Sequence, residues 1–231
     1  MSDIFKEVED DLRRERLKTL WDRYGIFVLG AALLIVIITA GWRGYEAWET
    51  NRDRTAGDTY LTVLNEVEGV STAGSADTLL AFAADAPGGY GILAEFRAAT
   101  ILADAGESVR AADLLNTIAD DGEAPAVYRD LARIRQGQVL LDAGDAQAAV
   151  DVVSGLAEDA GNPFYASAQE LMGLAAYAAD DLSGARRWFT AVTEEVGTPP
   201  GVRARARFML ALITQTAPEA DAAGTTAEEA N

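Results

Sequence analysis

An uncharged run of eighteen residues, positions 25–42 (GIFVLGAALLIVIITAGW), constrains this chain more than any other feature of its sequence. A helix rises about 1.5 Å per residue, so the run spans roughly 27 Å, close to the hydrocarbon thickness of a bilayer. A buried core helix rarely combines such a run with aromatic flanks, so we predict a single transmembrane helix over residues 25–45. The flanking aromatic residues, typical of membrane headgroup belts, are Trp21, Tyr24, Trp42, Tyr45 and Trp48.

Basic residues near the run predict its orientation, because Lys and Arg are enriched on the cytoplasmic side of membrane helices. Before the run stand Lys6, Arg13, Arg14, Arg16, Lys18 and Arg23, and within fifteen residues after it only Arg43, Arg52 and Arg54. The N-terminus is therefore predicted to be cytoplasmic, with the C-terminal part across the membrane. A cleaved signal peptide is the alternative, but the segment before the run is unusually long and acidic, and residues 38–40 (ITA) are a poor cleavage sequence.

Composition divides the chain into four predicted parts: a cytoplasmic head (1–24), the transmembrane helix (25–45), a repeat domain (46–214) and an acidic tail (215–231). The tail is rich in Ala, Glu and Thr without apolar periodicity, which predicts disorder. In the repeat domain, apolar residues recur at helical spacing and are interrupted by short Gly, Pro, Asn and Asp clusters. This pattern predicts an all-α domain of helical hairpins.

Three hairpins align with one another at offsets of 38 and 36 residues, through ILADAGESVRAADLL (101–115), VLLDAGDAQAAVDVV (139–153) and AYAADDLSGARRWF (176–189). Two-helix units of this kind resemble tetratricopeptide repeats, so an α-solenoid is predicted. An opening hairpin is expected from residues 48–67 and 78–84, and a closing helix from residues 202–214. The units are divergent, because they exceed the usual length of about 34 residues and lack the pattern's large residue at Glu95, Arg133 and Gln169.

Small residues recur where the two helices of each predicted hairpin should cross, because a close crossing leaves no room for a branched side chain. These small positions are Ala99, Gly137 and Gly173 in the first helices and Ala111, Ala149 and Ala185 in the second helices. One turn beyond them, Leu115, Val153 and Phe189 are predicted to supply the bulky side chain of each pair.

Charge and missing residue types exclude several classes of function. The chain has 37 acidic and 19 basic residues, and this net charge of −18 disfavours binding to nucleic acids. It has no Cys and no His, which removes disulfides, thiolate metal sites and Cys or His catalysis. Residues 120–123 (DDGE) lack the spacing of a calcium loop, and no carboxylate pair indicates a hydrolase. We predict no enzyme, no cofactor and no small-molecule substrate.

The whole arrangement resembles the YfgM-like family, ancillary subunits of the bacterial Sec translocon. The resemblance covers roughly residues 1–214 and includes the charged head, the anchor that ends in Gly41-Trp42, and the divergent repeats, with residues 88–115 the most similar stretch. It implies a single-pass protein of the bacterial inner membrane whose domain lies in the periplasm. It also implies partners among translocon subunits, periplasmic chaperones and newly exported chains, and it carries over no catalytic residue.

Concave faces of such repeats usually bind peptides in extended or helical form. Counting from the small positions predicts a candidate peptide groove formed by Phe96, Thr100, Ile134, Gln138, Leu141, Leu174 and Tyr177. Alternatively, Phe96, Ile134 and Leu174 complete the core between repeats.

The predicted function is that of a membrane-tethered protein-interaction scaffold, an ancillary translocon subunit that links export to periplasmic chaperones. Tethering would raise the effective concentration of partners near the channel exit. The alternative is an assembly or scaffolding factor for another cell-envelope complex.

Overall fold

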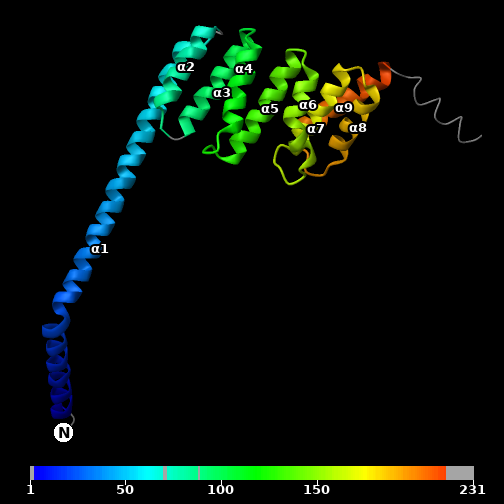
Figure 1. The fold of residues 1–231 in the computed structure, drawn as a ribbon. Coiled ribbons are helices and arrows are strands. Elements are labelled where there is room, and N and C mark those ends of the chain that lie inside the picture. Colours follow the sequence, from blue (N-terminus) through cyan, green and yellow to red (C-terminus); the bar gives the residue numbers. More distant parts are fainter. Residues whose placement is uncertain (1–2, 70–71, 88, 217–231) are drawn as a thin grey trace, which may run out of the picture. The chain divides into compact units, whose positions relative to one another are not determined.

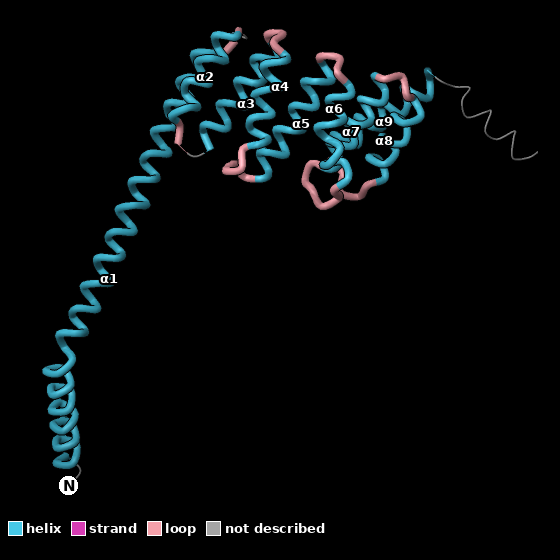
Figure 2. The backbone as a smooth tube through the Cα atoms, in the orientation of Figure 1, coloured by secondary structure: helices cyan, strands magenta, loops and turns pink. Residues whose placement is uncertain are grey.

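The computed structural model describes residues 3–69, 72–87 and 89–216, and every regular element within them is a helix (Figure 2). The helices are α1 (Asp3–Val67), α2 (Ala73–Asp85), α3 (Gly89–Asp104), α4 (Ser108–Asp120), α5 (Ala126–Asp142), α6 (Ala146–Glu158), α7 (Tyr165–Ala178), α8 (Leu182–Glu194) and α9 (Pro200–Thr216). The chain forms two compact units, Met1–Thr55 and Ala56–Asn231. The predicted all-α class is confirmed.

Helix α1 contains the predicted head, the predicted membrane span and the first helix of the opening hairpin. In the described part of the chain, no helix is long and apolar enough to cross a membrane. The side chains of residues 3–22 and of Gly25, Val28, Ala31 and Ala32 lie outside that part. The structure therefore does not show the predicted transmembrane helix. The tail predicted from residue 215 falls, beyond Thr216, outside the described residues.

The second unit is an α-solenoid in which each helix from α2 to α9 packs against the next (Figure 1). The first helices of successive hairpins, α3, α5 and α7, and the closing helix α9 also contact one another in that order. Within the described residues, the backbones of the second helices α2, α4, α6 and α8 do not approach one another in this way. The first helices therefore form the inner row, on the side toward which a solenoid of this kind curves.

The three tight turns inside the hairpins share one backbone geometry. Each contains a residue in the left-handed conformation: Gly106 (φ 81°), Gly144 (φ 86°) and Asp180 (φ 60°). In the first turn the amide of Glu107 donates to the carbonyl of Leu102 at 2.8 Å, and the other two turns have the same bond. This is the Schellman motif, in which glycine fits best because it has no Cβ.

Substituting Asp180 with Gly is expected to raise the free energy of unfolding by about 0.5–1 kcal/mol, because the left-handed conformation costs about 1 kcal/mol when a Cβ is present. The reciprocal change, Gly144→Ala, should lower it by about 1 kcal/mol. Urea unfolding midpoints of both variants would measure this. A loss of stability in Asp180→Gly would show instead that the aspartate side chain stabilises the turn by more than its backbone strain.

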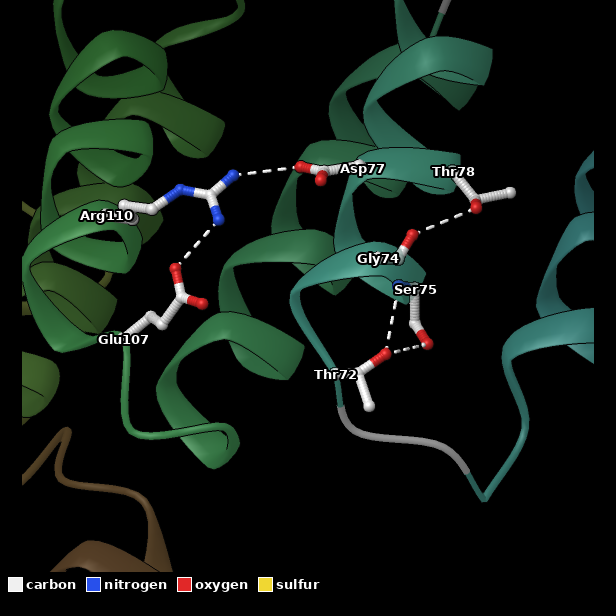
Figure 3. A network of polar contacts seen from close by, with 7 residues as sticks. All are labelled: Thr72, Gly74, Ser75, Asp77, Thr78, Glu107 and Arg110. Atoms are coloured by element: carbon white, nitrogen blue, oxygen red, sulfur yellow. Dashed lines mark hydrogen bonds and ion pairs between the residues drawn. The ribbon is translucent and has the colours of Figure 1, made fainter.

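Helix α2 begins five residues earlier than predicted, at Ala73 instead of Thr78. Thr72 caps it, since its hydroxyl oxygen accepts a hydrogen bond from the amide of Ser75 at 3.3 Å (Figure 3). The same view shows Arg110 of α4 donating to Asp77 of α2 at 2.9 Å and to Glu107 at 2.7 Å. These groups are exposed, so their ion pairs contribute little to stability. They nevertheless link two neighbouring second helices.

Candidate peptide-binding groove

The six predicted small positions lie in the interior of the solenoid, where the helices of each hairpin cross. A Cβ added to Gly137 would stand 2.7 Å from Cγ1 of Val153, and one added to Gly173 would stand 2.8 Å from Cε1 of Phe189. Ala99 shares a buried cluster with Leu115. These positions therefore set how closely the helices approach, and all six are buried, although Ala99 also contributes to the lining of the groove between α3 and α5. The buried small residues are Ala99, Ala111, Gly137, Ala149, Gly173 and Ala185.

An open groove of about 410 Å³ lies between the first helices α3 and α5, in the inner row of the solenoid. Phe96, Thr100 and Gln138 of the predicted groove residues line it. Thr100 and Gln138 are exposed, whereas Phe96 is half-buried against Ala99 and its neighbours. The structure thus gathers these three predicted side chains at one surface.

The other four predicted groove residues do not line this groove. Ile134 is only 5% exposed and packs in the cluster that contains Val153. Leu141 is half-buried against the same cluster, Tyr177 is half-buried against the cluster around Phe189, and Leu174 packs against both. These side chains are covered because α5 and α7 each contact neighbouring helices on both sides. The structure therefore places them in the core between repeats, which was the alternative for Ile134 and Leu174.

Several lining residues of the groove were not predicted. The 38-residue offset between the two hairpins relates many of the lining residues, predicted or not, in pairs. At four positions along the groove, which we call levels, a residue of α3 and its equivalent on α5 both line it. The four pairs are Leu93 and Leu131, Arg97 and Arg135, Thr100 and Gln138, and Asp104 and Asp142. An alignment of the repeats for charge as well as for small residues would have found them. The groove therefore has two walls of matching chemistry.

The third hairpin does not continue this pattern. Its equivalents of the leucine, arginine and aspartate pairs are Ser167, Leu171 and Ala178. Glu170 occupies the position equivalent to Phe96 and Ile134, and it is 8% exposed. The matching chemistry is thus confined to α3 and α5.

Glu170 instead joins α7 to the closing helix. Its two carboxylate oxygens accept hydrogen bonds from Nε and from the second terminal nitrogen of Arg205, at 2.6 and 2.7 Å. The hydrogen bond to Glu170 raises the pKa of the Arg205 guanidinium above its ordinary value. This bidentate pair satisfies a buried carboxylate and so serves to attach α9.

Within the described residues, no group of three or more carboxylates is arranged to hold a metal ion. In the acidic turn at residues 120–123, Asp121 accepts a hydrogen bond from the amide of Glu123 at 2.8 Å. The carboxylate therefore closes its own turn, as Asp commonly does.

Comparison with protein families identifies a match to the model of a tetratricopeptide repeat-like domain over residues 18–222. Comparison with curated proteins and with solved structures gave no match. The matched range covers most of the chain and begins before the apolar run at residues 25–42. Domains of this kind generally mediate protein–protein interaction and are typically non-catalytic.

Proposed function

Since the chain belongs to the tetratricopeptide repeat-like family, we propose that it is a membrane-tethered scaffold that binds other proteins through the inner row of its solenoid. The observation that carries this proposal is the open groove between α3 and α5, lined by exposed side chains on two parallel walls. Repeat solenoids commonly bind peptides on such concave surfaces.

The exposure of the apolar run supports the membrane tether. The large apolar side chains described between Ile26 and Ile38 are 59–79% exposed. Residues 33–38 are consecutive, so they occupy every side of α1 and leave it no polar face. A protein in water rarely exposes so much contiguous apolar surface. A lipid bilayer would cover it on all sides.

The finer proposal is that the protein is an ancillary subunit of the Sec translocon in the bacterial inner membrane, with its N-terminus in the cytoplasm and its repeats in the periplasm. There it would bring periplasmic chaperones to newly exported chains by raising their local concentration. The excess of basic residues ahead of the apolar run supports the orientation. The resemblance of the head, anchor and repeats to YfgM-like proteins supports the translocon role.

Photocrosslinking in intact membranes tests this proposal. A photoreactive residue at Trp48 would report neighbours close to the membrane, and one at Thr100 would report partners in the groove. A photoreactive residue at Thr117, exposed on the second helix α4, is the matched control. Adducts with translocon subunits at Trp48 and with chaperones or exported chains at Thr100 are expected.

Adducts only with other envelope proteins would reject the translocon role and favour an assembly or scaffolding factor for another envelope complex. Equal capture at Thr100 and Thr117 would reject the groove as the binding surface.

A further inference from the structure

The paired residues of the groove follow one another along α3 and α5 in a fixed chemical order. Leu93 and Leu131 form the first level, and the two arginines follow four residues later on each helix. The two aspartates follow seven residues after the arginines. At about 1.5 Å per residue, these steps correspond to roughly 6 and 10 Å along the groove. An apolar level, a positive level and a negative level therefore follow one another.

The arginine pair has no internal counter-charge. Neither Arg97 nor Arg135 forms an ion pair with any residue that the structure describes. Arg97 instead lies near the phenol of Tyr60. Burial raises the pKa of Tyr60, and the positive charge of Arg97 lowers it to a smaller extent. A phenol is uncharged at neutral pH. Two exposed guanidinium groups thus line one groove, in a chain of net charge −18, and neither is paired with a carboxylate of the described chain.

Helix stability does not explain why α3 and α5 both carry an aspartate at the same level of the groove. Asp104 and Asp142 are the last residues of α3 and α5. The helix dipole disfavours negative charge at a C-terminus. Both carboxylates are exposed, and neither forms an ion pair within the described chain. Two aspartates at the same level of the groove would therefore attract a positively charged ligand group, whereas they do not stabilise the helices that carry them.

We propose that this groove binds an extended segment of a partner protein that presents an apolar side chain, a carboxylate two residues away and a basic side chain four residues beyond the carboxylate. An extended chain advances about 3.3 Å per residue and its side chains alternate between two faces, so only even spacings direct all three groups into the groove. Two residues match the first step, and four residues advance about 13 Å, which exceeds the second step by about 3 Å. The flexible stem of a lysine spans that difference. The apolar side chain lies against Leu93 and Leu131, the carboxylate between the arginines and the basic group between the aspartates. This inference rests on the proposed scaffold function and names the class of its partner.

The acidic tail of this chain does not have the required chemistry. Residues 217–231 contain three Glu and one Asp but no Lys or Arg. The charged residues are Glu219, Asp221, Glu228 and Glu229. The tail could place a carboxylate between Arg97 and Arg135, but it has nothing to offer the aspartate pair. Charge complementarity over the whole groove therefore favours a separate polypeptide.

Two fluorescein-labelled peptides of identical composition and net charge test the proposal. One contains Leu-Ala-Glu-Ala-Ala-Ala-Lys, and the other exchanges its charges as Leu-Ala-Lys-Ala-Ala-Ala-Glu. Each is also made in the reversed chain direction, because the groove has no defined polarity for the ligand. Fluorescence anisotropy with the full chain in detergent should show at least tenfold tighter binding of the first sequence in one direction. Equal binding of the two sequences would overturn the proposal.

A charge-inverted groove provides the decisive comparison. The variant Arg97→Asp, Asp104→Arg, Arg135→Asp, Asp142→Arg keeps the net charge and should prefer the exchanged peptide, whereas an unchanged preference would overturn the proposal. The control Asp113→Arg, Arg187→Asp moves charges on the exposed faces of α4 and α8 and should leave the preference unaltered. If the fourfold variant does not fold by circular dichroism, Arg97→Gln with Arg135→Gln should remove the preference.

Two further outcomes separate this inference from the scaffold function. If a peptide of residues 217–231 binds as tightly as the first peptide, the groove takes the chain's own tail and the proposed partner is wrong. If photocrosslinking at Thr100 captures proteins in membranes while the two peptides bind equally, the scaffold function stands and the charge order is wrong.

Discussion

Replacing Gly173 with Val is expected to lower the free energy of unfolding by about 3 kcal/mol, because its Cβ would stand 2.8 Å from the ring of Phe189. Phe189 has no exposed surface, so its ring has no solvent to move into. Gly173 lies within α7, whose backbone cannot shift without separating it from α8. The loss of unfolding free energy should therefore lie at the upper end of the range of about 1–3 kcal/mol that overpacked cores show. Urea denaturation of the full chain would measure it.

A double-mutant cycle identifies the ring as the cause. Phe189→Ala alone should cost about 3–5 kcal/mol through the cavity that it leaves. Combined with Gly173→Val, the loss should be smaller than the sum of the two, since the valine enters the vacated volume. The matched control is Gly155→Val on α6, where an added Cβ meets nothing within 4 Å. Its effect should stay within about 0.5 kcal/mol. Additive losses in the double variant would contradict this account.

The helical repeats were predictable because their signals are local and recur. Helical periodicity and the Gly-containing turns are set by the backbone within a few residues, so the boundaries of α3 to α8 follow from them. The start of α2 was missed because it depends on a single cap, the side chain of Thr72. The same reasoning predicted that residues 48–67 form the first helix of the opening hairpin, and the end of α1 does contact α2, for example through Tyr60 and Phe82.

The groove was only partly predictable, since periodicity assigns a residue to a face of its helix but not to a free surface. Phe96, Ile134 and Glu170 are equivalent in the repeats, yet their environments differ. Phe96 lines the groove, Ile134 is covered in the core and Glu170 is held by Arg205. Which of these occurs depends on the side chains of the neighbouring helices. The charge pairs, by contrast, recur between the first two hairpins at the same 38-residue offset as the small residues and were available from the sequence.

Introducing two arginines into the apolar run, Leu34→Arg with Ile37→Arg, is expected to release the protein from the membrane fraction. This follows from the proposed tether. At the centre of a spanning helix, Leu and Ile favour insertion by about 0.3–0.6 kcal/mol, whereas Arg opposes it by about 2.5–3.5 kcal/mol. Two substitutions therefore oppose insertion by about 6–8 kcal/mol, or at least four orders of magnitude in the equilibrium. Ultracentrifugation after extraction with alkaline carbonate would measure the loss.

The location of the new charges, and not their number, should decide this outcome. Leu61→Arg with Asn65→Arg adds the same two charges to α1 at exposed positions beyond the run, where Leu61 is 58% exposed. This control should remain in the membrane fraction, because no bilayer is proposed to surround that part of the helix. If both variants stay membrane-bound, the attachment does not depend on residues 25–42, and a partner protein must hold the chain there. If both are released, added positive charge by itself weakens the attachment, and the run is not a spanning anchor.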